Sequence, residues 1–264
     1  MKHFRRYRRY QTSGMTKRIR NAISALLALL CITGCAGDDR GKPITDDTAS
    51  GEVTAVPADV GIYSDAYSPG EIMDYFFEVA FGSEYGTSSD RLCRWVSEIH
   101  YEIIGDCTES DRELMDYLFE TLNSIDGFPG IRAARFGERV NFKIYFVTRD
   151  ELCEMFEYAN EDCTGMSEYS WRTETCEIFE ARAAIDCEET YERESTICEE
   201  ILQSMGIGND SMSYQNSVFF QGTCLYKRPS SLDIAVVELL YSPALSVGMT
   251  KAEAIPVAAS ALRW

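Results

Sequence analysis

Histidine is scarce in this chain of 264 residues, which contains only two, His3 and His100. A nucleophile activated by histidine, as in Ser-His-Asp or Cys-His sites, would have to use one of these side chains. We expect His100, which lies in a strand pattern, to be a surface or core residue rather than a metal ligand. The sequence also has no CxxC pair and no glycine-rich phosphate loop after a strand, so neither a zinc ribbon nor a thioredoxin-type redox site is indicated.

The first 34 residues have the pattern of a bacterial lipoprotein signal. A basic segment precedes an apolar run from Ala22 to Ile32, which is too short for an ordinary transmembrane helix. The run ends in Ile-Thr-Gly-Cys35, which resembles a lipobox, in which the cysteine is acylated and becomes the first mature residue. We therefore expect removal of residues 1–34 and a lipid on Cys35 as the membrane anchor, outside the cytoplasm in the cell envelope. A short anchor that is never cleaved is the alternative.

Basic residues are few once this segment is set aside. Residues 1–34 hold eight of the 25 Lys and Arg and none of the 43 Asp and Glu, so the remainder has 17 basic and 43 acidic residues and a formal net charge of −26. This charge disfavours nucleic acid as a partner, and it disfavours adhesion of the folded domain to anionic lipid. We favour solubility over a specific cation-binding role as its explanation.

The expected mature chain has an even number of cysteines besides Cys35. They are Cys93, Cys107, Cys153, Cys163, Cys176, Cys187, Cys198 and Cys224. An even count in an exported protein favours disulfides, and Cys153/Cys163 and Cys176/Cys187 are near enough in sequence for local bridges. The pairing stays open at this stage. Buried thiols are the alternative, particularly for Cys198, which lies on the apolar side of its expected helix.

The remaining chain divides into a tether and one domain. Residues 35–68 are rich in Gly, Asp, Thr, Ala and Pro, as is typical of a flexible tether, and residues 69–264 suffice for one domain. Apolar spacing predicts helices over 71–80, 109–122, 148–158, 191–205, 231–241 and 250–262, and strands over 92–104, 140–147, 168–173 and 177–185. This order predicts an α+β fold with a mixed sheet before the helix over 191–205. The expected subdomains are 69–206 and a smaller helical part, 207–264.

One motif in the helix expected over 191–205 is more specific than the rest. Its sequence is Glu199-Glu200-Ile-Leu-Gln203-Ser-Met-Gly206-Ile-Gly-Asn209-Asp210, which resembles the metzincin zinc-protease motif HExxHxxGxxHD with all three histidines replaced. The resemblance implies a zincin (metzincin)-like fold. It assigns the ligand positions to Glu199, Gln203 and Asn209 and the general-base position to Glu200. One carboxylate and two amides are poor zinc ligands, so we expect no metal and no cofactor.

Two families share parts of this region. Residues 196–221 resemble an uncharacterised bacterial lipoprotein family, a domain of unknown function typified by EELTQxLGLxNDS followed by SxF, and the similarity covers roughly residues 140–255. The more distant resemblance to matrixin-like metzincins continues through Asn209-Asp210-Ser211, Leu232-Asp233 and Leu240-Tyr241. At the turn near Val218–Phe220 a phenylalanine stands where that family has the methionine of its Met-turn.

The motif residues allow several arrangements. Positions four apart share a helix face, so we expect Glu199, Gln203 and Asn209 to converge across the bend at Gly206. Their side chains can then satisfy one another as a polar network without catalysis, which we favour. Asp210 and Ser211 are expected to cap the turn. A hard cation on Glu199 and Asp210 is the alternative.

These observations predict a surface-anchored lipoprotein with a degenerate, zinc-free domain. The expected partners are the membrane, through the lipid on Cys35, and an extended peptide or cell-envelope polymer added to a strand at the groove. The alternative function is an active peptidase-like hydrolase that uses Glu200 with a non-standard metal or with none. Adjacent Glu199 and Glu200 point about 100° apart on a helix, so they cannot serve as the paired carboxylates of a glycosidase.

Overall fold

The structure, a computed structural model, describes residues 4–8, 67–81, 90–156, 159–224 and 226–262. Cys35, the apolar run of the expected signal and nearly all of the expected tether lie outside the described residues.

Most of the helices begin with a capping box. The described chain contains α2 (Pro69–Val79), α3 (Glu109–Ser124), α4 (Arg149–Met155), α5 (Arg193–Gln203), α6 (Ser231–Tyr241) and α7 (Lys251–Ala261). In every one except α5, a Ser or Thr at the N-cap accepts from the backbone N–H three residues later, and the acidic side chain there accepts from the backbone N–H of the cap. These reciprocal bonds satisfy donors that the first helical turn leaves open.

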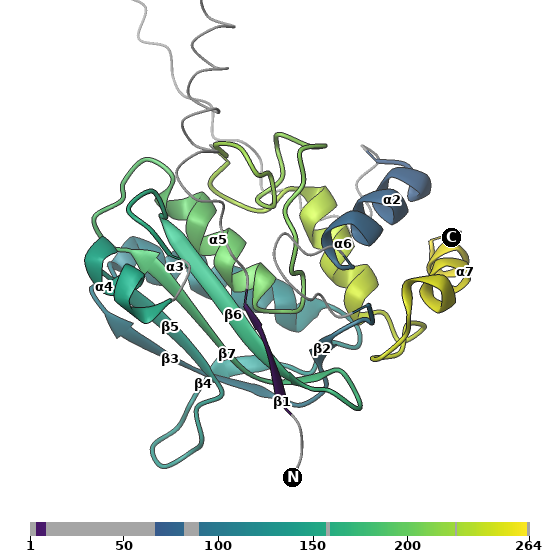
Figure 1. The fold of residues 1–264 in the computed structure, drawn as a ribbon, viewed down its shortest axis with the longest axis horizontal. Helices are drawn as coiled ribbons and strands as arrows, with labels where there is room; N and C mark the ends of the chain where they lie inside the picture. Colours follow the sequence, from purple (N-terminus) through teal and green to yellow (C-terminus); the bar gives the residue numbers. More distant parts are fainter. Residues whose placement is uncertain (1–3, 9–66, 82–89, 157–158, 225, 263–264) are drawn as a thin grey trace, which may run out of the picture.

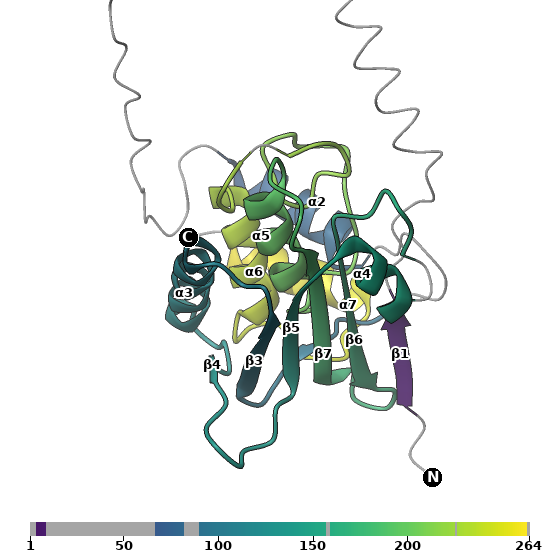
Figure 2. The same ribbon diagram turned by 90° about the vertical axis from the view of Figure 1, so that its left-hand side faces the viewer.

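A mixed, mostly parallel sheet forms the centre of the fold. Its strands are β1 (Phe4–Arg8), β2 (Arg94–Trp95), β3 (Ile99–Gly105), β4 (Ile131–Ala133), β5 (Phe142–Val147), β6 (Gly165–Arg172) and β7 (Glu177–Asp186). Their order is β4-β3-β5-β7-β6-β1, from left to right in Figure 2, and β2 pairs with the beginning of β7. β6 runs antiparallel to β7, and β1 antiparallel to β6, whereas the other pairings are parallel.

Helices cover the two faces of the sheet unequally. Along β5, Phe142, Ile144 and Phe146 point into the main core, which the sheet shares with α2, α3, α5, α6 and α7. The alternate residues Tyr145 and Val147 point to the opposite face, where they pack against a small cluster under α4. In Figure 1, α5 lies along the sheet, with α6 and α2 beyond it. The main core includes residues on both sides of Gly206, so the two expected subdomains share one core.

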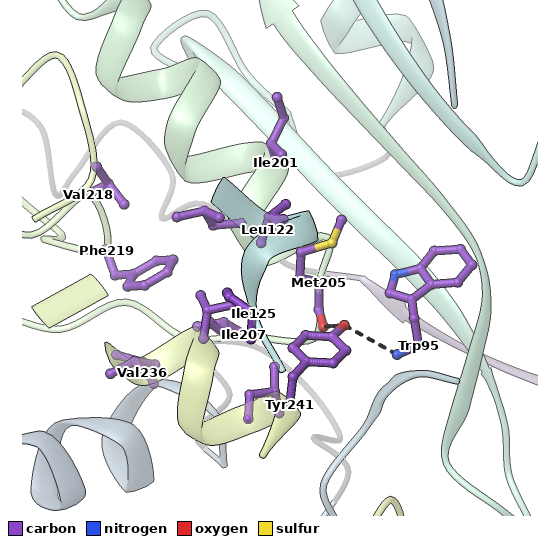
Figure 3. Close-up of a cluster of buried hydrophobic side chains, with 14 of the residues drawn as sticks. Trp95, Leu122, Ile125, Ile201, Met205, Ile207, Val218, Phe219, Val236 and Tyr241 are labelled. Carbon is purple, nitrogen blue, oxygen red and sulfur yellow. Dashed lines mark hydrogen bonds between the residues drawn. The ribbon is translucent and has the colours of Figure 1, made fainter. Parts of the chain in front are cut away.

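The end of α5 is held by residues from distant parts of the chain (Figure 3). The indole Nε1 of Trp95 donates to the carbonyl oxygen of Ser204 at 2.9 Å. The hydroxyl of Tyr241 donates to the carbonyl oxygen of Met205 at 2.8 Å. Ser204 and Met205 directly follow α5, so these two side chains satisfy carbonyl groups of the turn that leads from the helix to Gly206.

Gly206 makes the bend after α5 possible. Its φ of +113° lies in a region that L side chains rarely adopt. A Cβ at this position would also lie 2.3 Å from the carbonyl oxygen of Cys93, so a side chain would force the backbone apart. The expected bend at Gly206 is therefore present, and it requires glycine for two independent reasons.

The sheet departs from the sequence predictions more than the helices do. The strand expected over 92–104 is divided into β2 and β3, and β4 and β1 were not predicted. With three residues, β4 is too short to show a period. β1 falls in the basic segment that we assigned to the signal. The helix expected over 191–205 is shorter, Arg193–Gln203, because the chain after Gln203 turns toward Gly206.

Candidate functional site

The motif helix α5 packs closely against β6 on the main-core face of the sheet. A Cβ added to Gly165 would lie 2.4 Å from Cγ2 of Thr196 and 2.8 Å from Cγ of Glu200. Two residues along β6, the hydroxyl of Ser167 donates to Oε1 of Gln203 at 3.4 Å. One side of α5 is thus in contact with the antiparallel strand β6.

Gln203 is the centre of a polar network. Its Nε2 donates to Oε1 of Glu199 and to Oδ1 of Asp210, both at 3.2 Å, and its Oε1 accepts from Ser167. Gln203 is 0% exposed, so these bonds replace the water that its amide loses on folding. The structure brings Glu199, Gln203 and Asp210 together around one amide group, which we call the Gln203 network.

Asn209, which we expected beside Glu199 and Gln203, is directed elsewhere. Its Nδ2 donates to the carbonyl oxygen of Glu78 at 3.0 Å. Its backbone N–H donates to the carbonyl oxygen of Val79, also at 3.0 Å. Both acceptors lie at the end of α2, so Asn209 fastens that helix to the chain after Gly206. Asp210 takes the place in the network that the motif offsets had assigned to Asn209.

Ser211 shapes the turn that follows. Its Oγ accepts from the backbone N–H of Ser213 at 2.9 Å, and its own backbone pairs with Phe219 and Gln221. Ser211 therefore bonds backbone amides, whereas the carboxylate of Asp210 accepts from the side chain of Gln203.

Glu200 is buried between α5 and β6, with 1% of the residue exposed. Its side chain lies against Gly165, so it faces the sheet rather than an open surface. A general base has to reach the proton of a substrate or of a bound water. The position of Glu200 does not favour that role.

The residues at the zinc-ligand positions do not fit a zinc ion. The amide of Gln203 is occupied by two carboxylates, and that of Asn209 by a backbone carbonyl. Nowhere in the described residues do three or more His, Cys, Asp or Glu side chains form a group that could hold a metal. His100 lies on β3, where Nε2 is 2.7 Å from Oε2 of Glu98, and it takes no part in the Gln203 network.

A second buried network joins α2, the turn at Val218 and α6. The hydroxyl of Tyr75 donates to Oγ of Ser217 at 2.6 Å, and Ser217 in turn donates to the carboxylate of Asp233. Asp233 also accepts from the backbone N–H groups of Val218 and Ser230. Burial raises the pKa of the Asp233 carboxyl, although the bonds from Ser217, Ser230 and Val218 act in the opposite direction.

Sequence reasoning did not assign Tyr75, Ser217 or Ser167 to any site. Ser230 and Asp233 have the spacing of a capping box, which could have identified the carboxylate at the start of α6. No local pattern indicates the contact of Asp233 with Ser217, because the two residues meet only through the tertiary fold.

The outer edge of β6 is the second candidate surface. Residues 4–8 pair with it antiparallel, from Phe4 opposite Arg172 to Arg8 opposite Glu168. In Figure 2, β1 forms the margin of the sheet beside β6. On the face of the sheet away from α5 lies a pocket of ≈ 220 Å³, lined by side chains of both charges that include Lys143, Glu168, Glu180 and Arg182.

No helix among the described residues has the length and apolar character needed to cross a membrane. This finding does not address the anchor expected at Cys35, which lies outside the described residues.

Comparison with curated proteins and with solved structures finds no match to the chain. A comparison with protein families matches residues 69–260 to DUF2927, described as a protein of unknown function. The expectation of a family without an assigned activity is thereby confirmed. The matched region extends from the first residue of α2 into α7 and contains both buried networks. The chain therefore belongs to the DUF2927 family.

Proposed function

We propose that this protein is a lipoprotein of the cell envelope whose domain binds an extended peptide or envelope polymer along the outer edge of β6. The observation that carries the proposal is the antiparallel pairing of residues 4–8 with β6. An edge strand presents a row of backbone donors and acceptors to any extended chain. The edge of β6 is long and regular enough to hold one, since five consecutive residues pair with it without a shift in register.

The expected maturation gives this pairing its significance. Residues 4–8 lie within the segment 1–34, which the sequence predicts to be removed. A mature chain that begins at Cys35 would lack β1 and would offer the edge of β6 to another molecule. Binding by strand addition takes its affinity from main-chain hydrogen bonds and its specificity from pockets for alternate side chains. The pocket beside Glu168 and Arg182 supplies such a place on the face away from α5.

A zinc-free, metzincin-like scaffold is part of the same proposal. In zincins a strand forms one edge of the substrate groove, and here β6 lies directly against the helix that carries the motif. The buried position of Glu200 and the occupied amide of Gln203 support binding without hydrolysis. In the part of the chain that the structure describes, no observation favours the alternative peptidase-like hydrolase.

The proposal can be tested with a peptide of residues 2–10 and a chain of residues 35–264 carrying Cys35→Ser. In an antiparallel pair, alternate residues of the peptide donate to β6 and the others point away. Two N-methylated peptides, one modified at residues 4, 6 and 8 and one at 5 and 7, therefore form a matched set. Fluorescence anisotropy should show binding of the unmodified peptide and of one methylated peptide, with the other at least about tenfold weaker because its main-chain bonds are lost.

Charge attraction alone predicts a different result. The peptide is basic and the mature chain is acidic, so a non-specific complex would weaken with added salt and would be indifferent to N-methylation. Equal binding of the two methylated peptides, or loss of all binding at moderate salt, would count against strand addition.

A further inference from the structure

We propose that Cys93 forms a disulfide with Cys176, and Cys198 with Cys224. In the structure the eight cysteines of the described chain are thiols. The proposed partners are far apart in sequence, 83 positions for Cys93 and Cys176 and 26 positions for Cys198 and Cys224. All four are buried, with at most 6% of the residue exposed.

The register of the sheet places Cys93 beside Cys176. Arg94 pairs in parallel with Glu177, and Trp95 with Ile178, so the two residues before these pairs are Cys93 and Cys176. Cys93 and Cys176 each stand one residue before a paired position, Cys176 in the turn into β7 with a φ of +59°. Paired positions on neighbouring strands lie about 4.8 Å apart, and Cα atoms joined through a disulfide lie roughly 4.4–6.8 Å apart. Both side chains belong to the main core. The fold therefore brings Cys93 and Cys176 to the neighbouring starts of β2 and β7.

Contacts along α5 place Cys224 beside Cys198. The carbonyl oxygen of Cys224 accepts from the hydroxyl of Ser195 at 2.8 Å, and that of Lys227 accepts from the thiol of Cys198 at 3.7 Å. Ser195 and Cys198 are neighbours on one face of α5, because three positions separate them. Cys224 and Lys227 therefore both lie against the surface of α5 that carries Ser195 and Cys198.

Electrostatics agree with this placement. Burial raises the pKa of the Cys198 thiol well above its ordinary value, and the nearby Cys224 is one of the groups that raise it further. Burial also raises the pKa of Cys224, to about 11. Thiols of this kind are poor nucleophiles, which argues against a catalytic or redox-sensing role and in favour of a structural one.

The fold also corrects one local bridge that the sequence suggested. Cys176 immediately precedes β7 and Cys187 immediately follows it. A strand of 10 residues separates them, which corresponds to about 33 Å. A bridge between Cys176 and Cys187 is therefore impossible, and Cys93 is the partner that the register provides.

The chemistry requires an oxidant of the disulfide class. In each pair, two thiols lose two protons and two electrons as one sulfur–sulfur bond forms. The oxidant is a small or protein-borne disulfide, which accepts these electrons, loses its own sulfur–sulfur bond and leaves as two thiols by exchange. An exported protein meets such oxidants while it folds.

Trypsin digestion distinguishes the two bridges. The full chain is unfolded, reduced and refolded in a mixture of oxidised and reduced glutathione. It is then unfolded again in urea, so that buried free thiols react, alkylated without reductant and digested. We expect the peptide 92–94 linked to the peptide 173–182. Cys198 and Cys224 lie together in the peptide 194–227, which should be two hydrogens lighter than its dithiol form and carry no alkyl group. Reduction before alkylation should separate the first pair and add two alkyl groups to the second peptide.

A variant provides the internal control. In Cys198→Ser, Cys224 should become fully alkylated while the link between peptides 92–94 and 173–182 persists. Alkylation of these four cysteines in the refolded wild type, or their linkage to other cysteines, would overturn the proposal. A Cys198→Ser chain in which Cys224 remains protected would overturn the second bridge.

Discussion

The hydroxyl of Ser217 donates a hydrogen bond to the buried carboxylate of Asp233 and is itself fully engaged. Its oxygen accepts from the hydroxyl of Tyr75 at 2.6 Å and from the backbone N–H of Phe219 at 3.0 Å. Ser217→Ala should therefore leave two donors and part of a carboxylate without partners, at a cost of about 3 kcal/mol in the free energy of unfolding. Urea denaturation measures this loss. Tyr75→Phe, which keeps the bond between Ser217 and Asp233, should cost about 1 kcal/mol, and equal losses in the two variants would contradict this account.

The Gln203 network predicts which engineered positions could hold zinc. Replacing Glu199, Gln203 and Asp210 by His places three imidazoles where three polar groups already meet at 3.2 Å. The alternative triple variant carries Glu199→His, Gln203→His and Asn209→His, as the motif offsets suggest. Its third imidazole would point toward α2, because the side chain of Asn209 does. Isothermal titration should find Zn²⁺ at least about tenfold tighter in the first variant. Tighter binding by the Asn209 variant would show that the motif offsets, rather than the observed contacts, define the site.

Acid should weaken the contact between α3 and α5. Arg193 donates to the two carboxylate oxygens of Asp111 at 2.8 and 2.7 Å. Burial alone would raise the pKa of Asp111, but the bonds from Arg193 and Thr108 outweigh it and leave the pKa below its ordinary value. A lowered pKa in the folded state gives a stabilisation that is complete above the unfolded pKa of about 4 and is lost as the pH falls through the folded pKa.

Asp111→Asn should accordingly destabilise the protein by about 3 kcal/mol at pH 7, because it leaves the partly buried guanidinium of Arg193 without its counter-charge. Its stability should also fall less than that of the wild type when the pH is lowered below about 4. Urea unfolding at neutral and acidic pH provides both values. Glu109→Gln, at an exposed position in the same turn, is the matched control and should follow the wild-type curve.

Substitutions at two glycines measure separately how much a strained backbone conformation and a steric clash each reduce the free energy of unfolding. Gly206 and Gly137 both have positive φ, +113° and +83°, but a Cβ at Gly137 would meet nothing within 4 Å. Gly137→Ala should therefore cost about 1 kcal/mol. Gly206→Ala also forces Cys93 away and should cost about 2–5 kcal/mol. Thermal unfolding of the two variants tests the difference, and similar melting temperatures would refute the close approach at Cys93.

The proposed lipid anchor predicts a change in location. Cys35→Ser removes the acylated side chain, so the protein should accumulate as an unprocessed or soluble form. Fractionation of cells into membrane and soluble parts, with immunoblotting, provides the measurement. A distribution identical to that of the wild type would mean that another segment holds the protein at the membrane.

Local signals predicted most of the helices. Ser68-Pro69 places the start of α2, and the apolar spacing from Ser231 to Tyr241 predicts α6 with the bounds that the structure has. These signals succeed because capping and helical periodicity depend on residues a few positions apart. The three-residue strand β4 has no period to detect, and β1 becomes a strand only through its pairing with β6.

The site was predictable only as far as the helix face extends. Glu199 and Gln203 meet because they are one turn apart, which the sequence contains. The third partner follows Gly206, where the direction of the chain depends on a φ of +113° and on the anchoring of Asn209 to α2. The spacing of residues in the motif contains neither of these facts. The motif offsets therefore predicted Asn209 as the third member of the Gln203 network, whereas the structure has Asp210 there.

The end of α5 has a consequence for how the chain unfolds. Two carbonyl groups of the turn that follows it are satisfied by Trp95, 109 positions before Ser204, and by Tyr241, 36 positions after Met205. The part before Gly206 lacks Tyr241, and the main core contains residues from both sides of Gly206. Cleavage at Gly206 would therefore leave two pieces with exposed apolar surface rather than two stable halves. We therefore expect a single cooperative transition in which the sheet and the C-terminal helices lose their amide protection against hydrogen exchange together.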